Sequence, residues 1–136
     1  MVNKLDYITV LLNEWKTHIL CVTEHWLSYD ELSEIKIPDF YLADCCCRLH
    51  SNQHGGSAIF LRNGIIADKK IDVTNLVKPF VFEPCCVLIQ HFNLLCINFY
   101  RSSHNCRANY NEFLSYIDEV LHLAIKADKN INSLLF

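Results

Sequence analysis

Two kinds of hydrophobic spacing alternate along the chain and predict an order of helices and strands. Apolar residues recur at helical spacing near the N-terminus and predict a helix over residues 3–16; they are Leu5, Ile8, Leu12 and Trp15. Residues 18–23 contain an unbroken apolar run that predicts a buried strand. A polar connection follows, in which residues 29–35 are expected to form a short helical turn that ends before Pro38.

From residue 40 the pattern changes to short runs rich in β-branched residues, aromatic residues and cysteine. The runs at 40–49 and 55–62 flank a polar loop and predict two strands. Residues 64–73 are expected to continue the same antiparallel series. Residues 80–92 and 93–101 are almost wholly apolar, which predicts an antiparallel hairpin that is covered on both faces.

The clearest helical pattern covers residues 109–126. Its apolar stripe consists of Tyr110, Phe113, Leu114, Ile117, Val120, Leu121 and Ala124. Residues 131–136 then begin another apolar strand. This order of elements predicts an α/β sandwich in which helices pack outside mainly antiparallel sheets. No shift in composition divides the chain, so residues 1–136 are expected to form one domain or one piece of a domain.

Composition narrows the class of protein without identifying a function. The chain has 136 residues, of which 51% are hydrophobic and 20% charged, as in a core-forming globular protein. Its net charge of −3 does not favour nucleic-acid binding through a large basic surface. A bound divalent cation or a local basic groove would be needed to supply a positive field. Because no apolar run is long enough to span a bilayer and the N-terminus carries charges, we expect an intracellular protein with no membrane partner.

The eight cysteines do not follow the spacing of a zinc site. The sequence has no Cys-x-x-Cys pair, and the three contiguous cysteines at 45–47 would alternate between the two faces of a strand. In an intracellular protein, scattered thiols are mostly small buried hydrophobic side chains. The pattern therefore favours unligated thiols over a metal site.

Five short motifs follow one another over almost the whole chain: NKLDYITVLL, ILCVTEHWL, GGSAIFLRNGI, FEPCCVLI and INFYRSS. In this order they resemble the endonuclease/exonuclease/phosphatase superfamily, and most closely the endonuclease domains of non-LTR retrotransposons. That family is similar to AP endonucleases and DNase I, folds as a four-layer α/β/β/α sandwich, and hydrolyses phosphodiesters in DNA with Mg²⁺ or Mn²⁺. The resemblance implies a hydrolase with a DNA partner, nuclear if it acts on genomic DNA and otherwise cytoplasmic.

The resemblance also implies roles for five residues. Glu24, at the end of the strand at 18–23, matches the family's metal-binding glutamate, and carboxylate oxygens suit Mg²⁺. Tyr100 matches a residue that positions the phosphate or stabilises developing charge. Ser103 and Arg101 stand where the family contacts substrate phosphate, and His54 is expected to face the substrate groove. From position alone, these residues also fit ordinary structural roles: a strand-terminal acid, a half-buried tyrosine and a solvated loop histidine.

By the same resemblance, the chain corresponds to the N-terminal half of such a domain, truncated at both ends. The family's first strand would precede residue 3, its Gly-Asp-Phe-Asn motif would follow Phe136, and its C-terminal Asp-His pair is absent. We therefore expect the isolated chain to lack useful nuclease activity and to bind Mg²⁺ weakly or not at all.

A half sandwich is also expected to leave the inner face of a sheet open, with the cysteines at 45–47 and 85–86 partly on it, and to self-associate through that face. Two alternative functions stay open. One is a non-catalytic DNA- or protein-binding remnant of the same fold. The other is a member of the phosphatase branch that acts on small phosphate esters.

Overall fold

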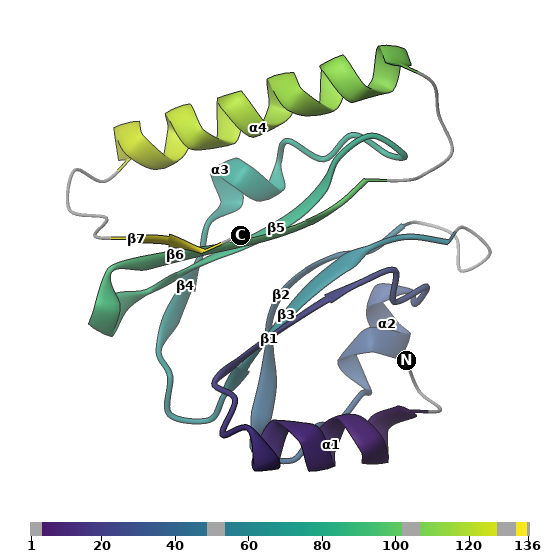
Figure 1. Ribbon diagram of the computed structural model, residues 1–136, viewed down its shortest axis with the longest axis vertical. Coiled ribbons are helices and arrows are strands. Elements are labelled where there is room, and N and C mark those ends of the chain that lie inside the picture. The colour runs from purple at the N-terminus through teal and green to yellow at the C-terminus, as the bar shows by residue number, and fades with distance from the viewer. Residues whose placement is uncertain (1–3, 49–53, 102–106, 128–132, 136) are drawn as a thin grey trace.

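The computed structural model describes residues 4–48, 54–101, 107–127 and 133–135, and these residues form a mixed α/β fold. The strands make two small sheets that face each other, and helices cover the outer face of each sheet (Figure 1). The layers therefore run in the order helices, sheet, sheet, helices. The α/β class predicted from the sequence is confirmed.

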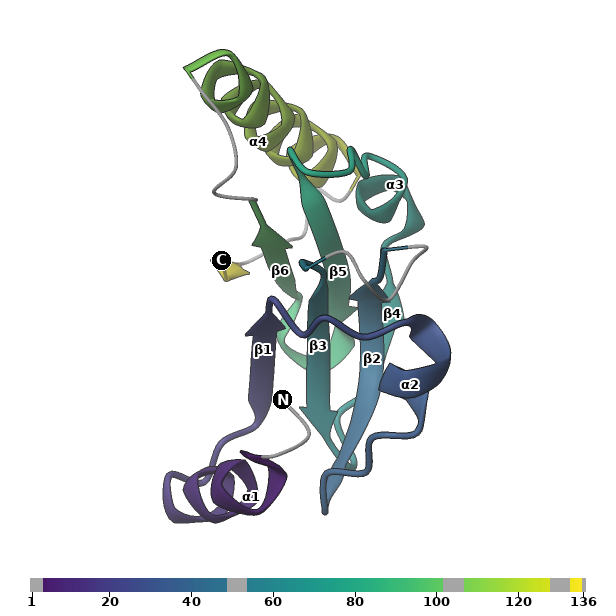
Figure 2. The ribbon, with the colours of Figure 1, turned by 90° about the vertical axis from the view of Figure 1, so that its right-hand side faces the viewer.

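The first sheet is antiparallel and has the strand order β1-β3-β2 (Figure 2). Its strands are β1 (Ile19–Thr23), β2 (Phe40–Cys46) and β3 (Ser57–Arg62). The helices against it are α1 (Leu5–Glu14) and α2 (Tyr29–Ser33). α2 begins at a capping box in which Ser28 and Glu31 exchange hydrogen bonds. The strand predicted at 18–23 is present, but the prediction that it is buried is wrong, because β1 is an edge strand that pairs with β3 alone.

The second sheet has the order β4-β5-β6-β7. Its strands are β4 (Ala67–Lys69), β5 (Glu83–Ile89), β6 (Leu94–Tyr100) and β7 (Ser133–Leu135). The predicted hairpin is confirmed, with the short 3₁₀ helix η2 (Gln90–Phe92) as its turn. α4 (Arg107–Ala127) covers the sheet and returns the chain so that β7 pairs parallel to β6. Only β4 continues the series predicted at 64–73; it joins this second sheet, and α3 (Ile71–Thr74) follows it.

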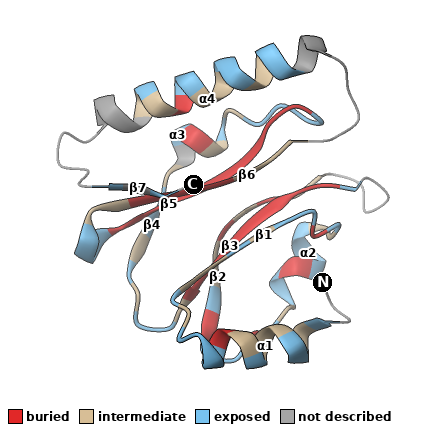
Figure 3. Ribbon diagram, viewed as in Figure 1, coloured by how far each residue is buried: buried red, intermediate tan, exposed pale blue. Residues whose placement is uncertain are grey.

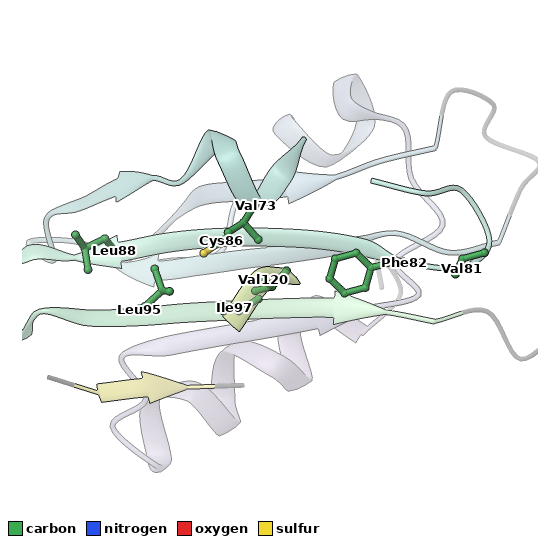
Figure 4. Close-up of a cluster of buried hydrophobic side chains, with 8 residues drawn as sticks. All are labelled: Val73, Val81, Phe82, Cys86, Leu88, Leu95, Ile97 and Val120. Atoms are coloured by element: carbon green, nitrogen blue, oxygen red, sulfur yellow. The ribbon is translucent and has the colours of Figure 1, made fainter. Parts of the chain in front are cut away.

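Each outer face is sealed by a hydrophobic cluster. Under α3 and α4 the buried side chains are Val73, Val81, Phe82, Cys86, Leu88, Leu95, Ile97 and Val120 (Figure 4). Phe82 is the largest of these, and its ring stacks on that of Tyr116 with 5.5 Å between the centroids. Under α1 and α2 the buried side chains are Leu12, Leu32, Ile37, Phe40, Ala58 and Phe60. Burial is greatest in the central strands β3 and β5 (Figure 3).

The inner faces of the two sheets cover each other. Their shared cluster contains Ile59, Leu61, Cys85, Val87, Ile89 and Cys96, each at most 2% exposed. The expectation of an open inner face is therefore wrong, because the chain supplies both sheets. Cys46, Cys85 and Cys86 are buried, while Cys45 and Cys47 are half-buried against the cluster under α1 and α2. Within the described residues, no helix has the length and apolar character to cross a membrane.

Candidate functional site

Polar side chains gather where β1 and β6 end and where β3 and β5 begin. The antiparallel register pairs Thr23 with Ser57 in the first sheet and Glu83 with Tyr100 in the second. The two pairs lie at the same end of the molecule, because the Ser57 hydroxyl donates a 2.7 Å hydrogen bond to the backbone carbonyl of Glu83. This end of the sheets is called the polar end below.

Glu24 and Tyr100 meet at the polar end. The Tyr100 hydroxyl donates a hydrogen bond to Oε1 of Glu24, which joins the end of β6 to the end of β1. The Glu24 side chain is exposed, and within the described part of the chain no partner is found for its second carboxylate oxygen. The two residues that the resemblance assigns to metal and phosphate therefore lie together, while their chemical roles stay predictions.

The backbone that carries Glu24 is strained. Glu24 and Trp26 have φ angles of 55° and 60°, in the left-handed region that non-glycine residues rarely adopt, at a cost of about 1–3 kcal/mol each. The Glu24 N–H donates to the carbonyl of Gly56 at 2.9 Å, and the Trp26 N–H donates to that of Gly55 at 3.1 Å. A Cβ at Gly56 would overlap the His25 ring and lie 2.9 Å from the Cys46 carbonyl oxygen. Glycine at this position therefore allows the close approach that holds the strained segment.

An exposed aromatic pair lies beside Glu24. The Trp26 side chain is 51% exposed, and its ring centroid is 4.2 Å from that of His54, with the rings tilted by 56°. The structure thus places His54 on the surface, paired with Trp26, which stands two positions after Glu24 in the sequence. Trp26 was not predicted as a site residue, although it stands two positions after Glu24 in the same motif.

The buried ring of His25 holds the strained segment in place through two hydrogen bonds. Its side chain is 3% exposed, and Nδ1 accepts a 3.1 Å hydrogen bond from the Leu27 N–H. The ring proton must then lie on Nε2, which is 3.3 Å from the carbonyl oxygen of Cys46 and donates to it. Burial lowers the pKa of His25, so the ring is held neutral. A neutral ring in this tautomer fixes the chain between Glu24 and Trp26.

Glu83 is a buried carboxylate that joins the two sheets at the polar end. It is 1% exposed and forms an ion pair with Arg48, whose Nη2 lies 2.6 Å from Oε1. The backbone N–H groups of Gly56 and Phe80 also donate to it, at 2.7 Å and 3.1 Å. The ion pair and these hydrogen bonds offset the free-energy cost of removing the Glu83 carboxylate from water. Glu83 is not among the predicted site residues; its one signal in the sequence is a charge at the start of a largely apolar run.

Three alternate residues of β6 contact β1 and form a cross-sheet ladder. Cys96 Sγ lies 3.9 Å from Cys21 Sγ, the Asn98 amide donates to the carbonyl of Val22 at 2.9 Å, and Tyr100 bonds to Glu24. Successive rungs are two residues apart because alternate side chains of a strand share a face. Asn98, which is 8% exposed, also donates to the Ala58 carbonyl at 3.0 Å. The ladder fixes the strand end that carries Tyr100.

Of the two remaining predicted substrate contacts, Arg101 is the one that lies in the described part of the chain. The Arg101 guanidinium lies over the rings of Tyr110 and Phe113, 5.7 Å from each centroid, and so packs on α4. Among the described side chains it forms no ion pair with Glu24. Ser103 lies outside the described residues.

The donor set at the polar end fits a magnesium ion only in part. In the described portion of the chain, no group of three or more His, Cys, Asp and Glu side chains is placed to hold a metal ion. Glu83 is paired with Arg48, so among the described residues Glu24 provides the one accessible carboxylate at the polar end. Mg²⁺ often uses one or two protein carboxylates and completes its shell with water and phosphate oxygens. Glu24 therefore fits as one ligand of a weakly held ion.

No protein-family model matches this chain, and no curated protein matches it.

Proposed function

We propose that the polar end is the metal- and phosphate-binding site of a DNA endonuclease-like domain of the endonuclease/exonuclease/phosphatase superfamily. The observation that carries the proposal is the hydrogen bond between Tyr100 and Glu24, which brings together the two residues that the sequence motifs assign to metal and phosphate. The order of the layers supports it, since the superfamily's four-layer sandwich has helices outside two facing sheets. On this proposal the chain forms part of such a DNase I-like sandwich.

Glu24 and Tyr100 have distinct tasks in this site. Glu24 would hold the Mg²⁺ ion through the carboxylate oxygen that does not accept the tyrosine hydrogen bond. The bound ion would neutralise phosphate charge and polarise the scissile phosphodiester. Tyr100 orients the carboxylate, and its phenol can donate a hydrogen bond to an oxyanion without carrying charge itself. The strained backbone and the buried His25 keep Glu24 in place for this task.

The aromatic pair favours a nucleic acid over a small phosphate ester as the ligand. Exposed rings next to a phosphate site provide a stacking surface for a nucleobase, which typically contributes about 1–3 kcal/mol per base. Trp26 and His54 form such a surface beside Glu24. With a net charge of −3, the chain needs a bound cation to attract DNA to this surface.

A second candidate function is DNA binding without cleavage. Among the described residues, one accessible carboxylate at the polar end can hold a divalent ion, and a single carboxylate holds such an ion weakly. On this reading, the polar end engages DNA through the metal and the aromatic pair and does not turn it over.

Fluorescence anisotropy with a labelled DNA duplex tests the proposal. We expect Mg²⁺ to tighten binding by about 3–10-fold relative to EDTA, since Coulomb attraction at a surface site is of the order of 1 kcal/mol. Glu24→Gln should lose this gain, whereas Glu14→Gln, a matched change of an exposed glutamate on α1, should keep it. An equal Mg²⁺ effect in wild type and Glu24→Gln would refute the proposal. A separate plasmid-nicking assay distinguishes the two candidate functions: nicking that depends on Mg²⁺ and on Glu24 would show cleavage and not binding alone.

A further inference from the structure

The contact of the cross-sheet ladder that lies farthest from Tyr100 along β6 is a pair of thiols from different sheets. Cys21 Sγ on β1 and Cys96 Sγ on β6 are 3.9 Å apart, although 75 positions separate them in the sequence. Cys21 is exposed and Cys96 is fully buried. One thiol is therefore accessible to a solute, and the other is held behind it by the core between the sheets.

The two thiols differ in acidity in a way that suits reaction between them. A hydrogen bond from Cys96 lowers the pKa of Cys21, and the same contact together with burial raises the pKa of Cys96. Because water solvates the Cys21 sulfur while burial raises the pKa of Cys96, the exposed sulfur carries negative charge more readily, and the thiolate is the reactive form of cysteine. The buried sulfur lies within van der Waals contact of it and is placed to act as the resolving thiol.

We propose that Cys21 and Cys96 form a peroxide-reactive thiol pair that closes to a disulfide between the two sheets. The Cys21 thiolate attacks hydrogen peroxide, the O–O bond breaks, and the hydroxide that leaves takes up a proton to form water. Cys21 is then a sulfenic acid. The Cys96 sulfur, losing its proton, attacks the Cys21 sulfur and breaks its S–O bond, and the departing hydroxide forms a second water. Two thiols are oxidised by two electrons in total, and one peroxide is reduced.

The position of β1 in the sheet permits this closure. The sulfur atoms must approach from 3.9 Å to about 2.05 Å. Among the described strands β1 pairs with β3 and lies at the edge of its sheet, so a shift of β1 toward β6 breaks no second ladder of hydrogen bonds there. The disulfide would tie together the two strands that end in Glu24 and Tyr100. The thiol chemistry itself does not rest on the proposed function.

Mass spectrometry of the whole chain after mild peroxide treatment tests this proposal. We expect the oxidised chain to lose two alkylatable thiols and to yield a peptide that links Cys21 to Cys96 rather than to Cys85 or Cys86. Because the link closes a long loop, the Tm should rise by roughly 5–15 °C and return to its starting value on reduction.

The chain contains a matched control for this experiment. Cys45 lies near the end of β2 and Cys47 directly follows the strand; the two thiols hydrogen-bond to each other, so they are the competing pair. Cys21→Ser changes only the exposed member of the proposed pair and should abolish both the linked peptide and the Tm rise. The double change Cys45→Ser with Cys47→Ser should keep both. Recovery of Cys21 as a free thiol or a sulfinic acid, or a linked peptide that joins Cys45 to Cys47 alone, would overturn the proposal.

Discussion

The same strands build two unlike ends of the molecule. At the polar end, strained backbone, a buried ion pair and a buried neutral histidine surround one exposed carboxylate. At the opposite end, a cavity of about 750 Å³ lies among the turns and is open to solvent. Its lining is mainly apolar and consists of His18, Ile19, Gly64, Ile65, Ile66, Ile89, Gln90, His91, Phe92 and Leu94.

The two ends differ in how many polar groups are held in place by specific partners. The cavity at the turns has few fixed polar groups, and two of its lining side chains, Ile66 and Phe92, are 68% and 61% exposed. The polar end instead contains interactions that cost free energy unless they are completed by specific partners, such as the desolvation of Glu83. Such costs are typical of positions retained for function rather than for packing. Changes at the polar end should therefore have larger effects than matched changes at the turns.

The largest expected effect is that of Glu83→Ala. The change leaves the Arg48 guanidinium buried without its carboxylate, which typically costs about 3–5 kcal/mol. Urea unfolding measures this loss as a shift of the transition midpoint. Asp68→Asn provides the control near the turns, since Asp68 makes an exposed hydrogen bond to Gln90, and it should cost less than about 1 kcal/mol. Equal losses for the two variants would contradict the contrast between the ends.

Asn98→Ala is expected to have the next largest effect. It leaves the carbonyls of Val22 and Ala58 without their amide donor, at a cost of about 1–3 kcal/mol. It should also loosen the placement of Tyr100 on Glu24. Unfolding experiments give the stability loss, and the Mg²⁺-dependent gain in DNA affinity reports on the site. Full retention of that gain would show that the ladder does not position Tyr100.

The elements of the fold could be predicted because their apolar spacing is strong. The α4 helix and the β5–β6 hairpin were located to within about three residues for this reason. The second sheet was not foreseen as the cover of the first, because spacing along a strand does not reveal which strands lie opposite each other. That error produced the expectation of an open inner face.

The site was predictable only where the motifs pointed to it. The convergence of Glu24 and Tyr100 followed from the resemblance, since spacing alone does not bring together residues 76 positions apart. Glu83 and Asn98 were missed because each is a single polar residue in an apolar run, and its meaning depends on partners far along the chain. The resemblance assigns Arg101 to backbone phosphate; this role stays a prediction, and the structure places its guanidinium over two rings of α4.

A smaller effect is expected from the protonation of His25. The folded chain holds its pKa below the ordinary value of 6.5, so between these two pKa values the unfolded chain binds the extra proton. The contribution of His25 to the free energy of unfolding should therefore be fully present above about pH 6.5. As the pH drops below this value, the free energy of unfolding should fall by roughly 1.4 kcal/mol per pH unit until the ring of the folded chain also takes up a proton. Urea unfolding across this range measures the slope. His25→Gln should lose the part of this pH dependence that His25 causes, whereas His54→Gln, a change of an exposed ring, should retain it.

The smallest effect is expected from Ile66→Ser at the turns. Because the side chain is 68% exposed, its replacement should change the free energy of unfolding by less than about 0.5 kcal/mol. DNA affinity with and without Mg²⁺ should also stay unchanged. A loss of more than about 2 kcal/mol, the size expected for a buried large-to-small change, would show that the cavity end is packed more tightly than its exposure indicates.

Paramagnetic broadening of backbone amide signals by Mn²⁺ reports directly on whether Glu24 binds a divalent ion beside Tyr100. We expect the broadening to centre on residues 23–26, 54–56 and 100, and Glu24→Gln to abolish it. Broadening that centres on another acidic surface, or that persists unchanged in Glu24→Gln, would show that Glu24 is not the ligand.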